Sequence, residues 1–219
     1  MLGNKIFVGL GVILMSWVSL FAPPQGWDQW QHFPSTEDQS YPILSGVRNY
    51  LGTAWLYQGF VQGTGLQREL WFRRSGDFGF HWENPIRLDN SGRVAGYDRN
   101  YDLTRGSWGY IFAVWSEFQP GPIYQLWFSY STDYGVTWTS PTRIDDDLGI
   151  ADPNYPYYPS LYVDDLNNLH LAVYYHNDPN DPEIGYSRYN TSTNTWEPYE
   201  CVYSHPLVFT SPEIITAGP

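Results

Sequence analysis

The chain has 219 residues, of which 19% are aromatic, and its formal net charge is −12. So many aromatic side chains favour packed β-structure and argue against disorder. Nucleic-acid binding is not expected, because phosphate contacts need a basic surface and Lys5 is the only lysine.

The first 22 residues are typical of an export signal. Lys5 supplies a positive charge, and an uncharged apolar run over 6–22 ends just before two prolines. This run is long for a signal peptide and short for a membrane-spanning helix. We therefore expect an exported protein, secreted, periplasmic or on the cell surface. Residues 1–22 would be a cleaved signal peptide or a retained anchor, and residues 23–40 a lead-in.

An internal repeat follows the lead-in. The segments 70–89 and 126–145 align without a gap at a shift of 56, and ten of their twenty positions are identical. A weaker third copy places Trp196 at 58 residues from Trp138. Repetition at this period is typical of architectures in which one supersecondary unit is stacked on the next.

Each unit is predicted to contain four short strands separated by turn residues. Alanines at 59-residue intervals, Ala54, Ala113 and Ala172, are interpreted as a second shared register on the second strand of each unit. Four-stranded units of this length are β-propeller blades. The predicted fold class is therefore all-β, a β-propeller of antiparallel blades over 41–89, 90–145 and 146–203, with 204–219 starting a fourth.

A specific motif, S-x-D-x-G-x-x-W, lies between the third and fourth predicted strands. The first copy consists of Ser75, Asp77, Gly79 and Trp82, and the second of Ser131, Asp133, Gly135 and Trp138. A degenerate third copy keeps Trp196. The motif resembles the Asp box of the sialidase superfamily and of other BNR-repeat propellers. The resemblance covers most of the chain from about residue 41 and implies the fold more strongly than an activity.

The physical interpretation of the motif is structural. An Asp side chain can accept hydrogen bonds from N–H groups of its own turn, and Gly permits a positive φ. The Trp is expected to cover the hairpin. We therefore expect Asp77 and Asp133 to support the fold, and Asp133→Ala to lower stability by about 1–3 kcal/mol.

The resemblance implies that ligands bind on the face opposite these turns. The loops predicted there span about 57–67, 116–123 and 176–183, with connections at about 89–98 and 145–157. Their carboxylates and aromatic rings are candidate ligand-binding residues: Asp145, Asp152, Tyr155, Tyr157, Asp178 and Asp181. Asp178, Asp181 and Glu183 could hold Ca²⁺, which takes several oxygen ligands. Solvated acidic loops without a ligand are the alternative, and no other cofactor is expected.

Catalysis is weakly supported. A sialidase needs an Arg cluster for the substrate carboxylate, a Tyr nucleophile and an Asp acid/base. The weak candidates are Arg48, Asp98 and Arg99, whereas Arg87 and Arg143 recur in register and are expected to pair within the repeat.

The leading functional hypothesis is a non-catalytic module that binds a glycan or another surface ligand. A sialidase-like exo-glycoside hydrolase and a structural or adhesive cell-surface protein are the alternatives. Three blades are fewer than a closed propeller needs. We therefore expect either that the sequence is truncated or that self-association completes the ring between chains.

Overall fold

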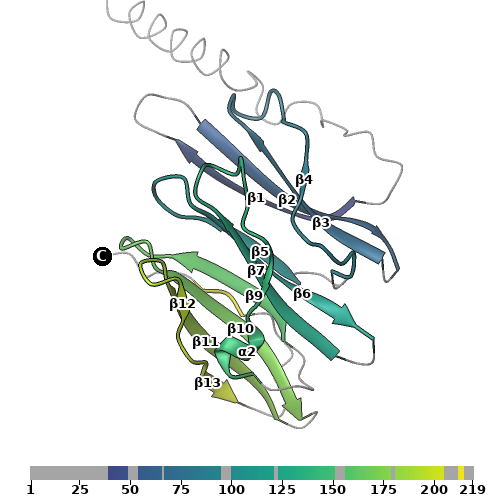
Figure 1. Ribbon diagram of the computed structural model, residues 1–219, viewed down its shortest axis with the longest axis vertical. Coiled ribbons are helices and arrows are strands. Elements are labelled where there is room, and N and C mark those ends of the chain that lie inside the picture. Colours follow the sequence, from purple (N-terminus) through teal and green to yellow (C-terminus); the bar gives the residue numbers. More distant parts are fainter. Residues whose placement is uncertain are drawn as a thin grey trace, which may run out of the picture.

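The computed structural model describes residues 39–48, 54–65, 67–94, 100–120, 123–150, 156–178, 181–204 and 212–214. Within them the chain forms three antiparallel sheets, arranged one after another in sequence order (Figure 1). The helix among these residues, α2 (Asp145–Leu148), is a single turn. The predicted all-β fold with four-stranded antiparallel units is confirmed.

The strands of each sheet follow one another as a meander. The first sheet contains β1 (Gln39–Arg48), β2 (Ala54–Thr64), β3 (Gln67–Ser75) and β4 (Ile86–Arg87). The second contains β5 (Tyr101–Arg105), β6 (Ile111–Gln119), β7 (Ile123–Ser131) and β8 (Thr142–Arg143). The third contains β9 (Tyr157–Val163), β10 (Leu169–Asp178), β11 (Asp181–Asn190), β12 (Thr195–Trp196) and β13 (Glu200–Ser204), with both β12 and β13 paired to β11.

Two hydrophobic cores join the three sheets. Because side chains alternate between the two faces of a strand, β6 contributes to both cores. Ile111, Ala113 and Trp115 pack toward the first sheet, against residues such as Phe72. Phe112 and its same-face neighbours pack toward the third sheet. The burial of every residue from Ile111 to Glu117 follows from this central position.

The alanine register proposed from the sequence is wrong. Ala113 pairs with Ser129, but the residue that pairs with the equivalent Ser187 is Leu171. Ala172 therefore lies one position further along β10. A one-residue shift moves a side chain to the other face of a sheet. Small size alone gave no information about which face each alanine occupies.

The loops predicted between the second and third strands are much shorter than expected. β2 and β3 stay paired from Leu56↔Ser75 to Thr64↔Gln67, and β6 and β7 from Ile111↔Ser131 to Gln119↔Ile123. The Gln, Gly and Ser residues of these segments resembled loop in the sequence, but they lie on paired strands.

The two S-x-D-x-G-x-x-W turns have the same internal hydrogen bonds. Asp133 Oδ1 accepts from the Ser131 hydroxyl at 2.8 Å and the Thr137 N–H at 2.9 Å, and Oδ2 accepts from the Thr137 hydroxyl at 2.6 Å. In the first sheet, Asp77 Oδ1 accepts from the Ser75 hydroxyl and the His81 N–H, both at 2.8 Å. The carboxylates thus satisfy donors within their own turns.

The glycine of the second turn also lets two sheets approach closely. Gly135 has φ +81°, and a Cβ there would lie 2.5 Å from the Phe72 ring. Trp138 packs edge-on against the same ring, with centroids 4.9 Å apart. This turn therefore connects the second sheet to the first.

Arg87 and Arg143 each pair within their own repeat, with Asp89 and Asp145 respectively. The start of a fourth blade predicted over 204–219 lies mostly outside the described residues. None of the described helices is long and apolar enough to cross a membrane.

Candidate functional site

The first strands of the three sheets lie next to one another, with β1 against β5 and β5 against β9. A cavity of about 250 Å³ opens between them where β5 and β9 begin, at the end of the sheets opposite the S-x-D-x-G-x-x-W turns. We call it the axial cavity. Its main lining residues are Ile43, Tyr101, Asp102, Tyr158, Ser160 and Glu213.

Asp102 connects the second and third sheets beside this cavity. Its Oδ1 accepts a hydrogen bond from the Leu103 N–H, and its Oδ2 accepts one from the Leu161 N–H of β9, both at 2.7 Å. Burial raises the pKa of Asp102, and the negative charge of Glu213 adds to this, so that the pKa is raised although the two N–H groups lower it. Each carboxylate oxygen has a second lone pair, so both can still accept from a ligand.

Two tyrosines shape the cavity walls. The Tyr101 hydroxyl donates to the Gly59 carbonyl at 2.9 Å, which joins β5 to the first sheet, and burial raises its pKa. Tyr158 has φ +51°, an uncommon conformation for a bulky residue. Its ring lies 5.9 Å from that of Tyr157 and 6.1 Å from that of Tyr174, between centroids.

Residues 212–214 form the remaining wall. The Ile214 N–H donates to Ser160 Oγ at 3.2 Å, which holds this segment against β9. Glu213 is exposed, and its charge acts on Asp102. The cavity thus combines two carboxyl groups with tyrosine rings, a set that can accept hydrogen bonds from hydroxyls and contact an apolar ring face.

None of the ligand-binding residues predicted from the sequence is among the described residues that line the axial cavity. Tyr157 lies on β9 next to Tyr158, with its ring 4.5 Å from that of Tyr124. Asp145 is instead 1% exposed, and Arg143 donates to both of its carboxylate oxygens. Its carboxylate is therefore turned inward and occupied. Asp152 and Tyr155 lie outside the described residues.

The predicted Ca²⁺ site remains a hypothesis. Asp178 and Asp181 pair at the end of the β10–β11 hairpin, but their side chains are outside the description. The Glu183 carboxylate accepts a hydrogen bond from the Tyr199 hydroxyl at 2.6 Å. Among the described residues, no group of three His, Cys, Asp or Glu side chains could hold a metal ion.

The structure does not describe the side chains of the weak catalytic candidates. Arg48 ends β1, but its side chain is not among the described ones, and Asp98 and Arg99 fall in a segment that is not described. No arginine is among the residues that line the axial cavity in the described part of the chain.

Sequence reasoning missed Tyr101, Asp102 and Glu213. Asp102 stands on a short strand between apolar residues, and a carboxylate in such a position is a signal that could have been used. Glu213 had no comparable signal, because only the fold brings it to β5 from more than a hundred residues away.

No protein-family model matches the chain, and no curated protein matches it. Solved structures do resemble it. A Hadza microbial sialidase, Hz136, gives a TM-score of 0.57 at 17% identity over 76% of this chain and 38% of that one. A protein of unknown function from Dyadobacter fermentans gives 0.51 at 14% identity over 74% and 50%. A PL25 ulvan lyase gives 0.50 at 12% identity over 73% and 43%.

These likenesses show the fold. The chain has the blade architecture of a β-propeller, and it spans between 38% and 50% of the length of these three structures.

Proposed function

We propose that this chain is part of an exported β-propeller that binds a glycan in the axial cavity without transforming it. The observation that carries the proposal is the composition of this cavity, where Asp102, Glu213 and the Tyr158 ring meet at the first strands of three sheets. Carboxylates accept hydrogen bonds from sugar hydroxyls, and an aromatic ring packs against the apolar face of a sugar.

The fold neighbours support a carbohydrate ligand. One is a sialidase, and the ulvan lyase was solved bound to -[GlcA(1-4)Rha3S]-. The strained backbone of Tyr158 also supports a ligand site, because such strain persists where the surrounding structure holds it and is concentrated at functional positions.

Binding without catalysis is favoured by the contacts of Asp102. Both of its oxygens accept backbone N–H groups, one of them on a neighbouring sheet. A carboxyl group that holds two sheets together has little freedom to act as acid or base on a substrate. A sialidase-like exo-glycoside hydrolase is the alternative, and release of sugar from a substrate would establish it.

The test uses Glu213→Gln, because Glu213 is exposed and its replacement leaves the cores intact. Glu200→Gln, on the outer strand β13, is the matched control. Binding of uronate-containing, sialylated and neutral oligosaccharides would be measured by calorimetry, with product analysis for turnover. We expect binding without turnover, weakened by Glu213→Gln and not by Glu200→Gln.

Two other outcomes would reject the proposal. Turnover that Glu213→Gln abolishes would favour the hydrolase. No oligosaccharide binding by the wild-type chain would favour a structural or adhesive role. Export remains a prediction from residues 1–22, and fractionation of the expressing cells would test it.

A further inference from the structure

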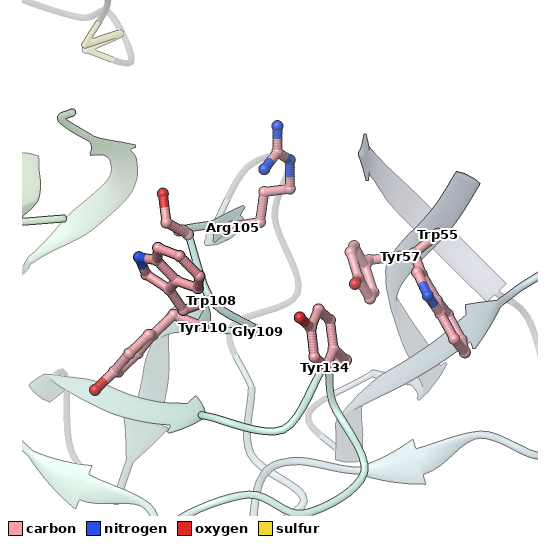
Figure 2. A pocket seen from close by; sticks show the side chains of 9 residues that line it. Trp55, Tyr57, Arg105, Trp108, Gly109, Tyr110 and Tyr134 are labelled. Atoms are coloured by element: carbon pink, nitrogen blue, oxygen red, sulfur yellow. The ribbon is translucent and has the colours of Figure 1, made fainter. Parts of the chain in front are cut away.

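A second cavity lies at the opposite end of the sheets. It has a volume of about 420 Å³ and is formed between the first and second sheets, next to their turns. We call it the turn-end cleft. Its lining includes five aromatic residues and one arginine: Trp55, Tyr57, Arg105, Trp108, Tyr110 and Tyr134. Figure 2 shows Trp108 and Tyr110 on one side, Trp55 and Tyr57 on the other, and Tyr134 between them.

Trp108 is the most unusual residue of the turn-end cleft. Its side chain is on the surface, with 87% of the residue exposed, and its φ is +59°. A bulky residue with positive φ is strained, and burial of the Trp108 ring does not compensate for this strain. Tyr134 is 46% exposed, and its φ of +61° matches the +62° of the equivalent Phe78, so this conformation belongs to the repeated S-x-D-x-G-x-x-W turn. Two exposed aromatic residues thus face one cleft, and Trp108 is the one whose positive φ that motif does not explain.

The backbone on both sides of Trp108 is held by neighbouring elements. The Ser107 N–H donates to Asn167 Oδ1 of the third sheet at 2.8 Å. The Gly109 carbonyl accepts from the Tyr134 N–H at 2.9 Å. These two contacts fix the turn that presents the indole ring. Asn167 is therefore a positioning residue, which acts through Ser107.

The opposite wall is fixed in a similar way. The Arg74 guanidinium lies over the Trp55 ring at 5.0 Å and donates to the Tyr134 carbonyl at 2.8 Å. Tyr57 is 2% exposed, and burial raises its pKa to about 12, so its hydroxyl stays protonated at neutral pH. Both walls are rigid before any ligand arrives, which reduces the entropy lost on binding.

The chemistry of the turn-end cleft fits a sugar chain better than an apolar ligand. Between the aromatic rings, Gly106, Ser107 and Gly109 complete the lining with small residues, of which Ser107 carries a hydroxyl. Arg105 stands at the edge with five N–H donors, so contacts to other groups still leave donors for ligand hydroxyls. The volume lies in the range of about 300–1,000 Å³ that is usual for small-ligand sites.

We propose that the turn-end cleft is a second glycan-binding site, in which a short oligosaccharide packs against Trp108 and Tyr134. It is independent of the axial cavity and lies at the other end of the sheets. The two sites together would let one chain hold a polysaccharide at two places, which increases the overall affinity for a long polymer.

The main test is Trp108→Gly, which removes the ring and suits the positive φ. Leu166→Gly is the matched control, because Leu166 has the equivalent turn position in the third sheet and is 82% exposed. The probes are cellulose, xylan, mannan and chitin oligosaccharides, titrated into the full chain by calorimetry. We expect Trp108→Gly to weaken binding to at least one probe by about tenfold or more, and Leu166→Gly to leave it unchanged.

Asn167 variants test how the ring is positioned. Asn167→Gly keeps the positive φ of Asn167, +67°, but removes the acceptor for Ser107. Asn167→Asp keeps an acceptor. We expect the first to weaken binding and the second to retain it, and Asn167→Gly to have no further effect once Trp108→Gly is present. A purely structural role of Asn167 would instead lower affinity equally in both backgrounds.

Three results would overturn the proposal. They are an unchanged affinity in Trp108→Gly, no binding of any of the four probes, and binding of a polyproline peptide in place of a glycan. Glu213→Gln separates this proposal from the axial site, because it is expected to leave the Trp108-dependent binding intact. Thermal unfolding of each variant would verify folding, and Trp108→Asn, which also tolerates positive φ, would replace a variant that fails to fold.

Discussion

The turns 106–110 and 164–168 occupy equivalent places in neighbouring sheets and are stabilised in different ways. Both close a hairpin with the same backbone contact, from Gly106 N–H to Tyr110 carbonyl and from Asp164 N–H to Asn168 carbonyl. The Asp164 carboxylate then accepts from Leu166 and Asn168 N–H groups within its own turn. The second-sheet turn has glycine at this position and depends on Asn167 of the third sheet.

The difference separates stability from function. Turn 164–168 is stabilised largely by the Asp164 side chain, with one outside hydrogen bond from the Thr191 hydroxyl to the Asn167 carbonyl, and its exposed Leu166 has no positive φ. Turn 106–110 carries a strained, exposed Trp108 and is held by contacts from outside. A functional site can require a backbone conformation that its residue disfavours, such as the positive φ of Trp108, and contacts from neighbouring residues then stabilise that conformation.

The largest effect expected from this comparison is the loss of stability caused by Asp164→Ala. Asp164→Ala removes the acceptor of the Leu166 N–H, the Asn168 N–H and the Asn168 side-chain amide, and it also removes the partner of His170 Nε2. We expect the free energy of unfolding to fall by about 2 kcal/mol, because partly buried donors are left without a partner. Urea unfolding would measure it. Asp165→Ala, at the exposed neighbouring carboxylate, should change stability by less than about 0.5 kcal/mol.

The next largest loss of stability is expected from Gly106→Ala, which creates a clash between the two turns. A Cβ on Gly106 would lie 2.4 Å from Asn167 Oδ1, so Gly106→Ala displaces this side chain and removes the acceptor of the Ser107 N–H. We expect a loss of about 1 kcal/mol in unfolding free energy. In an Asn167→Gly background the same substitution should be nearly neutral. Additive effects in the double mutant would show that the two residues are not coupled.

The fold could be predicted from the sequence because the repeated residues are those whose contacts lie within a few positions of the chain. The S-x-D-x-G-x-x-W turns satisfy their own donors within a few residues, so their pattern is visible in the chain. The alanine register failed because the face of a strand depends on which sheet packs against it. Sequence alone did not separate Ala113 from Ala172.

The candidate sites were harder to predict because distant segments form them. Trp108 was not singled out from the sequence, although a Trp between Ser107 and Gly109 in a turn was the clue to an exposed ring. The axial cavity depends on Asp102 and Glu213, whose approach follows from blade packing and not from any motif.

A smaller effect concerns pH. Burial alone would raise the pKa of Asp133, but hydrogen bonds from Thr137 and Ser131 outweigh it and lower the pKa from 3.8 to about 2. The carboxylate therefore adds stability above the unfolded pKa, and this contribution is lost as the pH falls toward 2. Because Asp133 is largely solvated, we expect less than about 1 kcal/mol.

Asp133→Asn would measure this contribution. The difference in unfolding free energy between wild type and Asp133→Asn should shrink as the pH is lowered from neutral to 2. Turn 106–110 contains no carboxylate, so the stability change caused by Trp108→Gly should stay constant over the same range. An Asp133→Asn difference that stays equally constant would contradict the assigned role of the carboxylate.

The smallest effect is the most direct measure of the strain at Trp108. Replacing a residue by glycine increases the freedom of the unfolded chain, which lowers stability by roughly 0.5–1 kcal/mol where the native φ is negative. Leu166 is such a position, whereas Trp108 has φ +59°, where glycine also relieves about 1 kcal/mol of strain. Leu166→Gly should therefore destabilise the protein slightly, and Trp108→Gly should leave stability within about 0.5 kcal/mol of wild type. Equal losses in urea unfolding would mean that Trp108 is unstrained, and its exposed ring would then need no function to explain it.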